Sequence, residues 1–365
     1  MTPYGIQSDT HNHAWHAFAT TLESGVNSRL QTILDETWRL ALSVKKLGGK
    51  TMYHCGDLFH VRGNIAPSVL NPTLDLYRKI VEELGIEPRL LAGNHDLEGR
   101  DASRVSSAIT ALEGIGCKIV NKPTAFYDDQ VMMIPWIQDT DELKKTIESM
   151  CKGLAEHEDE GARIDDLHTW TLMIHAPVDG VIAGLPAHGI TDEYLASLGF
   201  QYVFSGHYHH HKDFGNGVYS VGASTHQTWS DVGAKAGFLL VTRLGVKWMK
   251  SHAPDFVEID GDMDEFEIKT LVDGNYVRAK ISTANTVDVE RVRAFLVENG
   301  AKGVTILSTK VAVEASRSIS TVKAGSSIEA SVSEFIKKSS VTVDHEHLTM
   351  LCNAILAEAR MEIAE

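Results

Sequence analysis

The feature that most constrains the fold is the stretch Leu90–Asp96, in which an apolar run leads into a Gly-Asn-His-Asp turn. The run 88–92 predicts a buried strand, and Gly93 allows a turn where a Cβ would clash. Asn94 and His95 then follow the carboxyl end of the strand, where open α/β sheets place their ligand sites. Such a turn is also common on protein surfaces, so the rest of the chain has to decide its role.

The same arrangement, an apolar strand followed by Asp or His, recurs along the chain. Further strands of this kind are predicted at 5–8, 50–55, 169–174 and 201–205. The side chains that follow them are Asp9, His11, Asp57, His175, His207 and His209. Helical periodicity at 29–47 and 67–85 predicts βαβ units and a parallel sheet. We therefore expect all of these groups, with Asn94, at one sheet edge.

This set of side chains offers two neighbouring metal sites. Asp57, a carboxylate, is the natural bridge between two cations. Asp9, His11 and His209 would complete one site, and Asn94, His175 and His207 the other. Carboxylate, imidazole and amide ligands suit Mn, Fe or Zn rather than a purely hard-ion cage, and the lack of thiolates disfavours a closed structural zinc site.

Two cations about 3.5–4 Å apart clamp a phosphoryl group and lower the pKa of a water that attacks phosphorus. The leaving alkoxide then needs a proton, and His95, beside Asn94, is the predicted acid. The alternative for His95 is a turn residue hydrogen-bonded to Asp96. We expect His54 to be a core histidine with a hydrogen-bond partner. The other histidines near the motifs are expected to be solvated, namely His13, His16, His210 and His211.

The net charge of −15 argues against a nucleic-acid substrate. Its distribution weakens that argument, because residues 139–166 carry −6 and residues 255–267 carry −7. The segments that hold the motifs are nearly neutral, and bound cations would make their site positive. We expect 139–166 to form a surface helix pair or an insertion, with breaks at Gly153 and Gly161, and 255–267 to be an acidic linker.

The same sequence predicts three domains and a cytoplasmic location. The site-bearing domain spans 1–254, a β-α-β cap of α+β type spans 268–314 and extends to about 325, and C-terminal helices span 327–365. The N-terminus lacks the pattern of a signal peptide, and no apolar run approaches membrane-spanning length. The 4 scattered cysteines favour a reduced, cytosolic protein without disulfides.

The ordered set of motifs resembles the calcineurin-like metallophosphoesterases over residues 1–250. The motifs are Asp9-x-His11, Gly56-Asp57-Leu58-Phe59-His60, Gly93-Asn94-His95-Asp96, His175 and Gly206-His207-x-His209. Gly-Asp-Leu-Phe-His is similar to the SbcD nuclease branch, whereas protein Ser/Thr phosphatases carry Gly-Asp-x-x-Asp-Arg-Gly. Val221–Ser224, Thr228–Asp231 and Gly237-Phe238 resemble phage SbcD-like subunits.

This resemblance implies a two-sheet α/β sandwich with a small capping domain. It implies a DNA nuclease of repair and recombination, with 3′→5′ exonuclease and endonuclease activity and two Mn²⁺ ions, Mg²⁺ being the alternative. It implies roles for His95 in catalysis and His60 in substrate binding. The implied partners are DNA, an SbcC-like coiled-coil ATPase that contacts the terminal helices, and a second copy of the chain that contacts helices near 67–85. No membrane partner is implied, and the implied location is the cytosol of a bacterium or of a phage-infected host.

Two other functions remain open at this point. A phosphodiesterase or phosphatase for small phosphate esters or cyclic nucleotides would use the same site, and the acidic surface favours it. A non-enzymatic subunit that only binds the ATPase is disfavoured by the complete ligand set.

Overall fold

The computed structural model describes residues 2–99, 106–156, 167–281, 286–308, 331–333, 336–337 and 344–364. The chain divides into two compact units, Met1–Thr309 and Lys310–Glu365. The predicted extension of the cap to about 325 lies outside the described residues, as does most of the range 327–343 of the predicted C-terminal helices.

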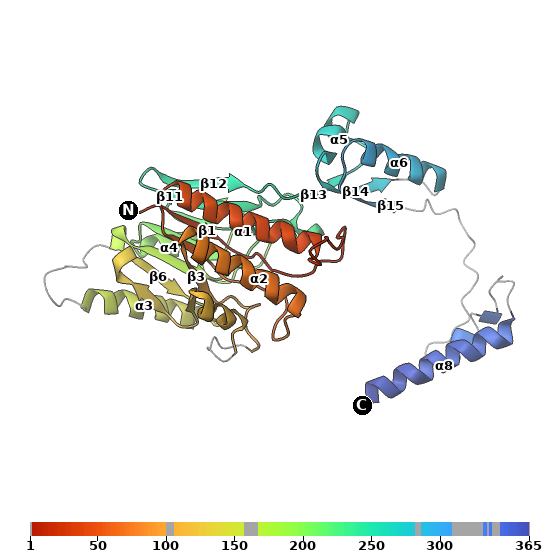
Figure 1. Cartoon of the computed structure of the whole chain (residues 1–365), viewed down its shortest axis with the longest axis horizontal. Coiled ribbons are helices and arrows are strands. Elements are labelled where there is room, and N and C mark those ends of the chain that lie inside the picture. The colour runs from red at the N-terminus through yellow and green to blue at the C-terminus, as the bar shows by residue number, and fades with distance from the viewer. Residues whose placement is uncertain are drawn as a thin grey trace. The chain divides into compact units, whose positions relative to one another are not determined.

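Two six-stranded sheets form the centre of the first unit (Figure 1). The first has the order β12-β11-β1-β2-β3-β4. Its strands are β1 (Tyr4–Gln7), β2 (Thr51–His54), β3 (Glu87–Leu91), β4 (Lys118–Val120), β11 (Gly237–Thr242) and β12 (Gly245–Lys250). Strands β1 to β4 are parallel, and β11 is antiparallel to β1.

The second sheet has the order β5-β6-β7-β8-β10-β9. Its strands are β5 (Thr124–Phe126), β6 (Val131–Ile134), β7 (Thr171–His175), β8 (Tyr202–Gly206), β9 (Lys212–Asp213) and β10 (Val218–Ser220). The four central strands β6, β7, β8 and β10 are parallel, and the edge strands β5 and β9 are antiparallel to their neighbours.

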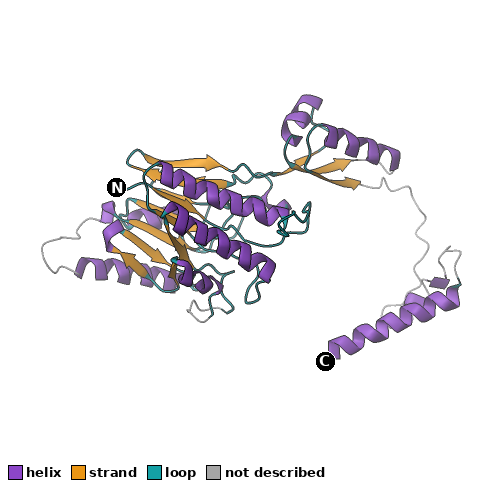
Figure 2. Ribbon diagram, in the orientation of Figure 1, coloured by secondary structure: helices purple, strands orange, loops and turns teal. Residues whose placement is uncertain are grey.

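Apolar side chains on both faces of the sheets build a four-layer sandwich. On β6, Val131 and Met133 pack between the sheets against Ile6 and Leu239, whereas Met132 and the other alternate positions face the outer helices. The helices are α1 (Ser28–Lys46), α2 (Pro67–Lys79), α3 (Thr140–Glu156) and α4 (Asp192–Ser197). α1 and α2 cover the first sheet, and α3 and α4 cover the second (Figure 2). The predicted two-sheet α/β sandwich is therefore confirmed.

The structure defines the strand partners and corrects one expected helix break. Strands β10 and β11 follow one another along the chain but belong to different sheets. Gly153 was expected to break a helix, but α3 continues through it to Glu156. A helix pays only about 1 kcal/mol for an interior glycine, and the packing of α3 on the second sheet outweighs that cost.

A smaller parallel sheet follows the sandwich. Its strands β13 (Phe256–Ile259), β14 (Tyr276–Ile281) and β15 (Gly303–Ser308) are covered by α5 (Glu265–Val272) and α6 (Thr286–Glu298). The acidic segment 255–267, expected to be a linker, contains β13 and the start of α5. The expectation placed too much weight on charge, because the acids are interspersed with Phe256, Val257 and Ile259, which are buried.

The second unit contains α8 (His345–Ala364), which matches the predicted C-terminal helix. Three of its apolar side chains are exposed, namely Met350, Leu351 and Ile355. None of the helices in the described part of the chain is long and apolar enough to cross a membrane.

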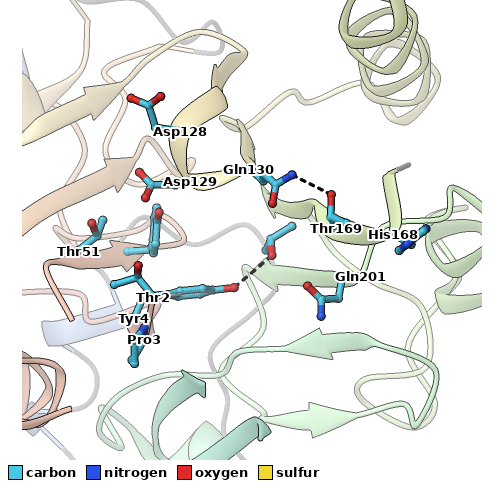
Figure 3. A pocket seen from close by; sticks show the side chains of 12 residues that line it. Thr2, Pro3, Tyr4, Thr51, Asp128, Asp129, Gln130, His168, Thr169 and Gln201 are labelled. Carbon is cyan, nitrogen blue, oxygen red and sulfur yellow. Dashed lines mark hydrogen bonds between the residues drawn. The ribbon is translucent and has the colours of Figure 1, made fainter. Parts of the chain in front are cut away.

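A cavity of about 480 Å³ lies at the amino ends of the strands (Figure 3). Thr51 and Thr171, the first residues of β2 and β7, line it, and Tyr4 Oη lies 3.1 Å from Thr171 Oγ1. The predicted site residues follow the opposite, carboxyl ends of the same strands. This cavity is therefore separate from the candidate metal centre.

Candidate metal centre

The predicted ligands lie where the carboxyl edges of the two sheets meet. Asp9, Asp57 and Asn94 follow β1, β2 and β3 of the first sheet, whereas His175 ends β7 and His207 follows β8 of the second. The expectation of a single sheet edge is thus wrong in detail. The sandwich brings two edges together, and His175 Nδ1 lies 2.7 Å from Cys55 O across the junction.

Several ligand positions have a backbone conformation that L-residues rarely adopt. The described residues with positive φ other than glycine are Asp9 (49°), His11 (44°), Phe18 (60°), Asp57 (59°), Gln130 (54°) and His207 (110°). Four of these six are predicted ligands. Such conformations cost about 1–3 kcal/mol each and persist where the surroundings enforce them, often at functional sites.

Side chains of the first predicted site converge. Ligand atoms of Asp9, His11 and His209 lie within 4.8 Å of one another. Asp9 is inaccessible to solvent, and its carboxylate accepts the backbone N–H of His207 at 3.1 and 3.2 Å. The Nε2 atom of His11 lies 3.6 Å from Asp57 Oδ2.

Side chains of the second predicted site converge around Asn94. Its Oδ1 lies 3.1 Å from His175 Nε2 and 3.1 Å from His207 Nδ1. His175 Nε2 is also 3.4 Å from Asp57 Oδ1. Asp57 therefore presents one carboxylate oxygen to each group of ligands, which is the position predicted for a bridge.

The electrostatics of the cluster fit a site for cations. Burial opposes the ionisation of Asp57, but His175 and His11 outweigh it and hold the pKa of Asp57 well below its usual value. Burial alone would lower the pKa of His175, yet Asp57 raises it to about 9. In the absence of a cation, a proton on His175 thus balances the negative charge of the Asp57 carboxylate. Carboxylates, imidazoles and an amide oxygen, without a thiolate, are a donor set that divalent transition metals accept.

Two histidines are fixed by partners on their outer nitrogens. A carbonyl oxygen can only accept, so His175 Nδ1 donates to Cys55 O and leaves Nε2 for a cation. His209 Nδ1 lies 2.7 Å from Asp231 Oδ1, which leaves its Nε2 free in the same way. Burial would raise the pKa of Asp231, but its bond to His209 lowers it to about 2. Carboxylate–histidine pairs of this kind orient metal ligands.

The sequence analysis did not predict that Asp231 orients His209, and it assigned no role to Trp136. Thr228 and Asp231 form a capping box at the 3₁₀ turn Trp229–Asp231, a pattern visible in the sequence, but the pattern does not name His209 as a partner. The ring of Trp136 stacks on that of His207 with centroids 5.2 Å apart.

Asp96 ties the loops after β2 and β3 together. Its carboxylate accepts the backbone N–H groups of Gly93, Asp57, Leu58 and Phe59 at 2.9–3.2 Å. Gly93 is needed here because a Cβ would collide with Asp57, which confirms the predicted clash and identifies the residue that causes it.

His95 and His60 lie beside the predicted ligands. His95 Nδ1 lies 2.6 Å from His60 O, so the ring of His95 bonds to this carbonyl rather than to Asp96. Its backbone N–H donates to Asp57 Oδ1 at 2.8 Å. The half-buried rings of His60 and His95 stack at 5.5 Å, 15° from parallel. Their catalytic and substrate-binding roles stay predictions.

The remaining histidines divide between the core and the surface. His54 is buried and bonds to Thr10 Oγ1 at 3.0 Å, as predicted for a core histidine. His16 is exposed. The prediction for His211 was wrong, because it is only partly accessible, stacks on Trp248 and bonds to Ser220 O at 2.9 Å.

Residues 2–211 match the family model of the calcineurin-like phosphoesterases, and the chain belongs to this family. The family identifies it as a metal-dependent hydrolase of phosphate esters that uses two divalent cations, and the converged Asp and His side chains are the candidate site for them.

Comparisons with individual proteins add little to this. A dimetal phosphatase from Danio rerio is similar in structure over 68% of this chain and 98% of its own, with 11% identity and a TM-score of 0.37. No curated protein matches the sequence.

Proposed function

We propose that the protein is a DNA nuclease with 3′→5′ exonuclease and endonuclease activity, the nuclease subunit of an SbcCD-like repair and recombination complex. The observation that carries the proposal is the Gly56–His60 motif, which is similar to the SbcD branch. In the structure this motif supplies both Asp57 and the imidazole of His60 that stacks on His95. Two imidazoles thus flank the predicted cation pair on the side of the loops after β2 and β3.

The site residues have separate tasks in this proposal. Asp9, His11 and His209 would hold one cation, Asn94, His175 and His207 would hold the other, and Asp57 would be shared between them. Mn²⁺ is the proposed metal and Mg²⁺ the alternative, because the donor set mixes imidazoles with oxygen ligands. When bound, the two cations neutralise the phosphoryl group and lower the pKa of the attacking water.

His95 is the proposed general acid. The carbonyl of His60 accepts from its Nδ1, which fixes the orientation of the ring and leaves Nε2 to face the substrate. In the imidazolium form, Nε2 carries the proton that the leaving alkoxide receives. Because the His95 backbone also donates to Asp57, the acid and the bridging carboxylate keep a constant separation.

The proposed partners are DNA, an SbcC-like coiled-coil ATPase and a second copy of the chain. The exposed apolar side chains of α8 support a role of the C-terminal helices at 327–365 in binding the ATPase. The proposed dimer contact involves α2 and the π-helical turn Ile80–Leu84 that follows it. The same proposal places the protein in the cytosol.

The competing function is hydrolysis of small phosphate esters or cyclic nucleotides. The net charge of −15 favours it, since an acidic surface repels a polyanion such as DNA. A purely structural role is disfavoured by the convergence of the predicted ligands.

The test is a cleavage assay with the full chain and Mn²⁺, with and without the ATPase, on linear duplex DNA, single-stranded DNA and cyclic nucleotides. We expect cleavage of DNA, and a His95→Ala variant that retains Mn²⁺ but cleaves about 10²–10⁴-fold more slowly. His16→Ala, an exposed histidine of the same region, is the matched control. Hydrolysis of cyclic nucleotides with none of DNA would establish the competing function, and unchanged cleavage by His95→Ala would refute the acid role.

A further inference from the structure

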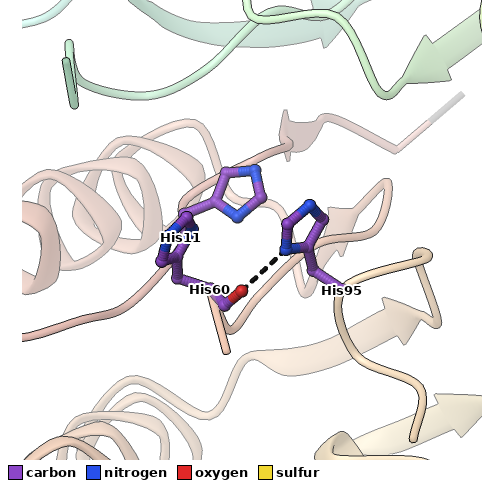
Figure 4. A group of neighbouring side chains, drawn as sticks. All are labelled: His11, His60 and His95. Atoms are coloured by element: carbon purple, nitrogen blue, oxygen red, sulfur yellow. Dashed lines mark hydrogen bonds between the residues drawn. The ribbon is translucent and has the colours of Figure 1, made fainter. Parts of the chain in front are cut away.

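A second group of potential metal ligands lies next to the predicted pair. Nitrogen atoms of His11, His60 and His95 lie within 4.8 Å of one another. Figure 4 shows the three rings around a common space, with a nitrogen of His11 directed between the other two rings. His11 is a predicted ligand of the pair, but His60 and His95 are not, so the three together are not one of the two predicted cation sites.

Two nitrogens of this group have no hydrogen-bond partner. His11 Nε2 faces Asp57 Oδ2 at 3.6 Å, whereas His11 Nδ1, on another edge of the ring, is buried and unpaired. His60 Nδ1 is also buried and unpaired. A buried polar atom left unpaired costs about 1–3 kcal/mol. His95 uses Nδ1 for its bond to His60 O, which leaves Nε2 as its ligand atom.

We propose that His11, His60 and His95 form a separate zinc site, and that zinc bound there inhibits the enzyme. Three neutral imidazoles without a carboxylate prefer Zn²⁺ strongly over Mn²⁺ or Mg²⁺. Tetrahedral zinc with bonds of about 2.0–2.1 Å needs nitrogens about 3.3 Å apart. The three nitrogens lie within 4.8 Å of one another, so zinc binding draws them together by at most about 1.5 Å. A water completes the four ligands.

Inhibition follows from the lone pairs of the rings. A neutral imidazole has one lone pair, so His11 binds one cation at a time. When Nδ1 of His11 holds zinc, the ring proton moves to Nε2. His11 can then no longer act as a metal ligand beside Asp9 and His209. Zinc also occupies Nε2 of His95, the atom proposed to donate a proton. The site therefore competes with one Mn²⁺ and with the acid, whatever the phosphoester substrate is.

The test measures zinc binding without any substrate, so its outcome is independent of whether DNA is cleaved. The full chain is loaded with Mn²⁺ and titrated with Zn²⁺ against a chromophoric chelator, while released Mn²⁺ is followed by electron paramagnetic resonance. We expect one equivalent of zinc to release one Mn²⁺ from the wild type. We expect His60→Ala and His95→Ala each to lower the zinc affinity at least tenfold, and His16→Ala to leave it unchanged.

Mn²⁺ binding in the same samples reports whether each variant is folded. Zinc can also displace Mn²⁺ from the pair itself, and in that case its affinity does not depend on His60. The proposal is overturned if either variant that still binds Mn²⁺ keeps the wild-type zinc affinity. His60→Asn, which keeps a polar side chain at this position, replaces His60→Ala if the latter binds no Mn²⁺.

Discussion

His54 and His175 are both buried, yet their pKa values move in opposite directions. Burial lowers the pKa of His54 to about 3, because Thr10 and the backbone N–H of Gly56 partner its neutral ring. His175 meets the Asp57 carboxylate, which overcomes burial and raises its pKa to about 9. At the scale of the single residue, the partner of the ring decides whether a histidine is structural or a ligand.

This difference predicts how the metal-free protein responds to acid. The unfolded His54 ring has a pKa of 6.5 and the folded one about 3, so between these values only the unfolded state binds the proton. Stability from this group is complete above pH 6.5 and falls by about 1 kcal/mol per pH unit as the pH decreases toward 3. His54→Asn retains an acceptor for Gly56 N–H and should have a correspondingly shallower pH dependence.

The measurement is urea unfolding in EDTA from pH 7 to pH 5, for the wild type, His54→Asn and the exposed control His16→Asn. The difference between wild type and His54→Asn should shrink by about 1 kcal/mol per unit below pH 6, and the control should follow the wild type. Parallel pH profiles for wild type and His54→Asn would show that folding does not lower the pKa of His54.

At the scale of the element, the short 3₁₀ turn Trp229–Asp231 orients the ring of His209. Asp231 Oδ2 accepts the backbone N–H groups of Gln227 and Thr228, each at 2.8 Å, and Oδ1 holds the His209 ring. The turn is therefore rigid before a cation binds, and it fixes the ring with Nε2 toward Asp9.

Asp231→Asn should weaken Mn²⁺ binding about 10–100-fold. The amide keeps the shape of the side chain but removes the negative charge that makes the His209 imidazole a stronger metal ligand. The fold should persist, since Asp231 lies in a turn and outside the sheets. Isothermal titration with Mn²⁺ checks this, with the exposed Asp213→Asn as a matched control. Equal Mn²⁺ affinity in the wild type and Asp231→Asn would show that the Asp231 charge has no influence on the site.

The elements also show what the sequence could predict. Runs such as Leu172–Ile174 are apolar and short, so the strands and the polar residues after them were predictable. The partner of each strand was not predictable, because β10 and β11 are consecutive in the chain but join different sheets. The bonds that Asp96 accepts from Asp57, Leu58 and Phe59 were equally hidden, as was the bond between Asp231 and His209. They join residues that are distant in sequence, and no local periodicity encodes them.

At the scale of the whole molecule, Arg29 links the small sheet to the metal centre. Its guanidinium is buried, lies over the rings of Phe256 and Tyr276, and donates to Gln227 O at 2.7 Å. Gln227 in turn donates from Nε2 to Asp9 O at 2.6 Å. Two strands of the small sheet are thus connected to the first predicted metal ligand through two side chains.

Arg29→Lys should therefore affect both stability and metal binding. Lysine keeps the charge but cannot reach several carbonyls at once or stack as a planar group. The loss of bonds to His226 O and Gln227 O, and of the ring contacts, should cost about 3 kcal/mol of unfolding free energy. A looser Gln227 should also raise the Mn²⁺ dissociation constant several-fold. Urea unfolding and Mn²⁺ titration measure the two effects.

The exposed Arg243→Lys is the matched control, since it makes the same chemical change in the turn between β11 and β12. If Arg29 acts only as a structural residue, Arg29→Lys loses stability while the folded fraction binds Mn²⁺ as the wild type does. If it also positions Asp9, the Mn²⁺ affinity of the folded fraction falls in conditions where unfolding is negligible. Because Asp9 has a strained φ of 49°, its conformation depends on neighbours such as Gln227, and we expect the second outcome.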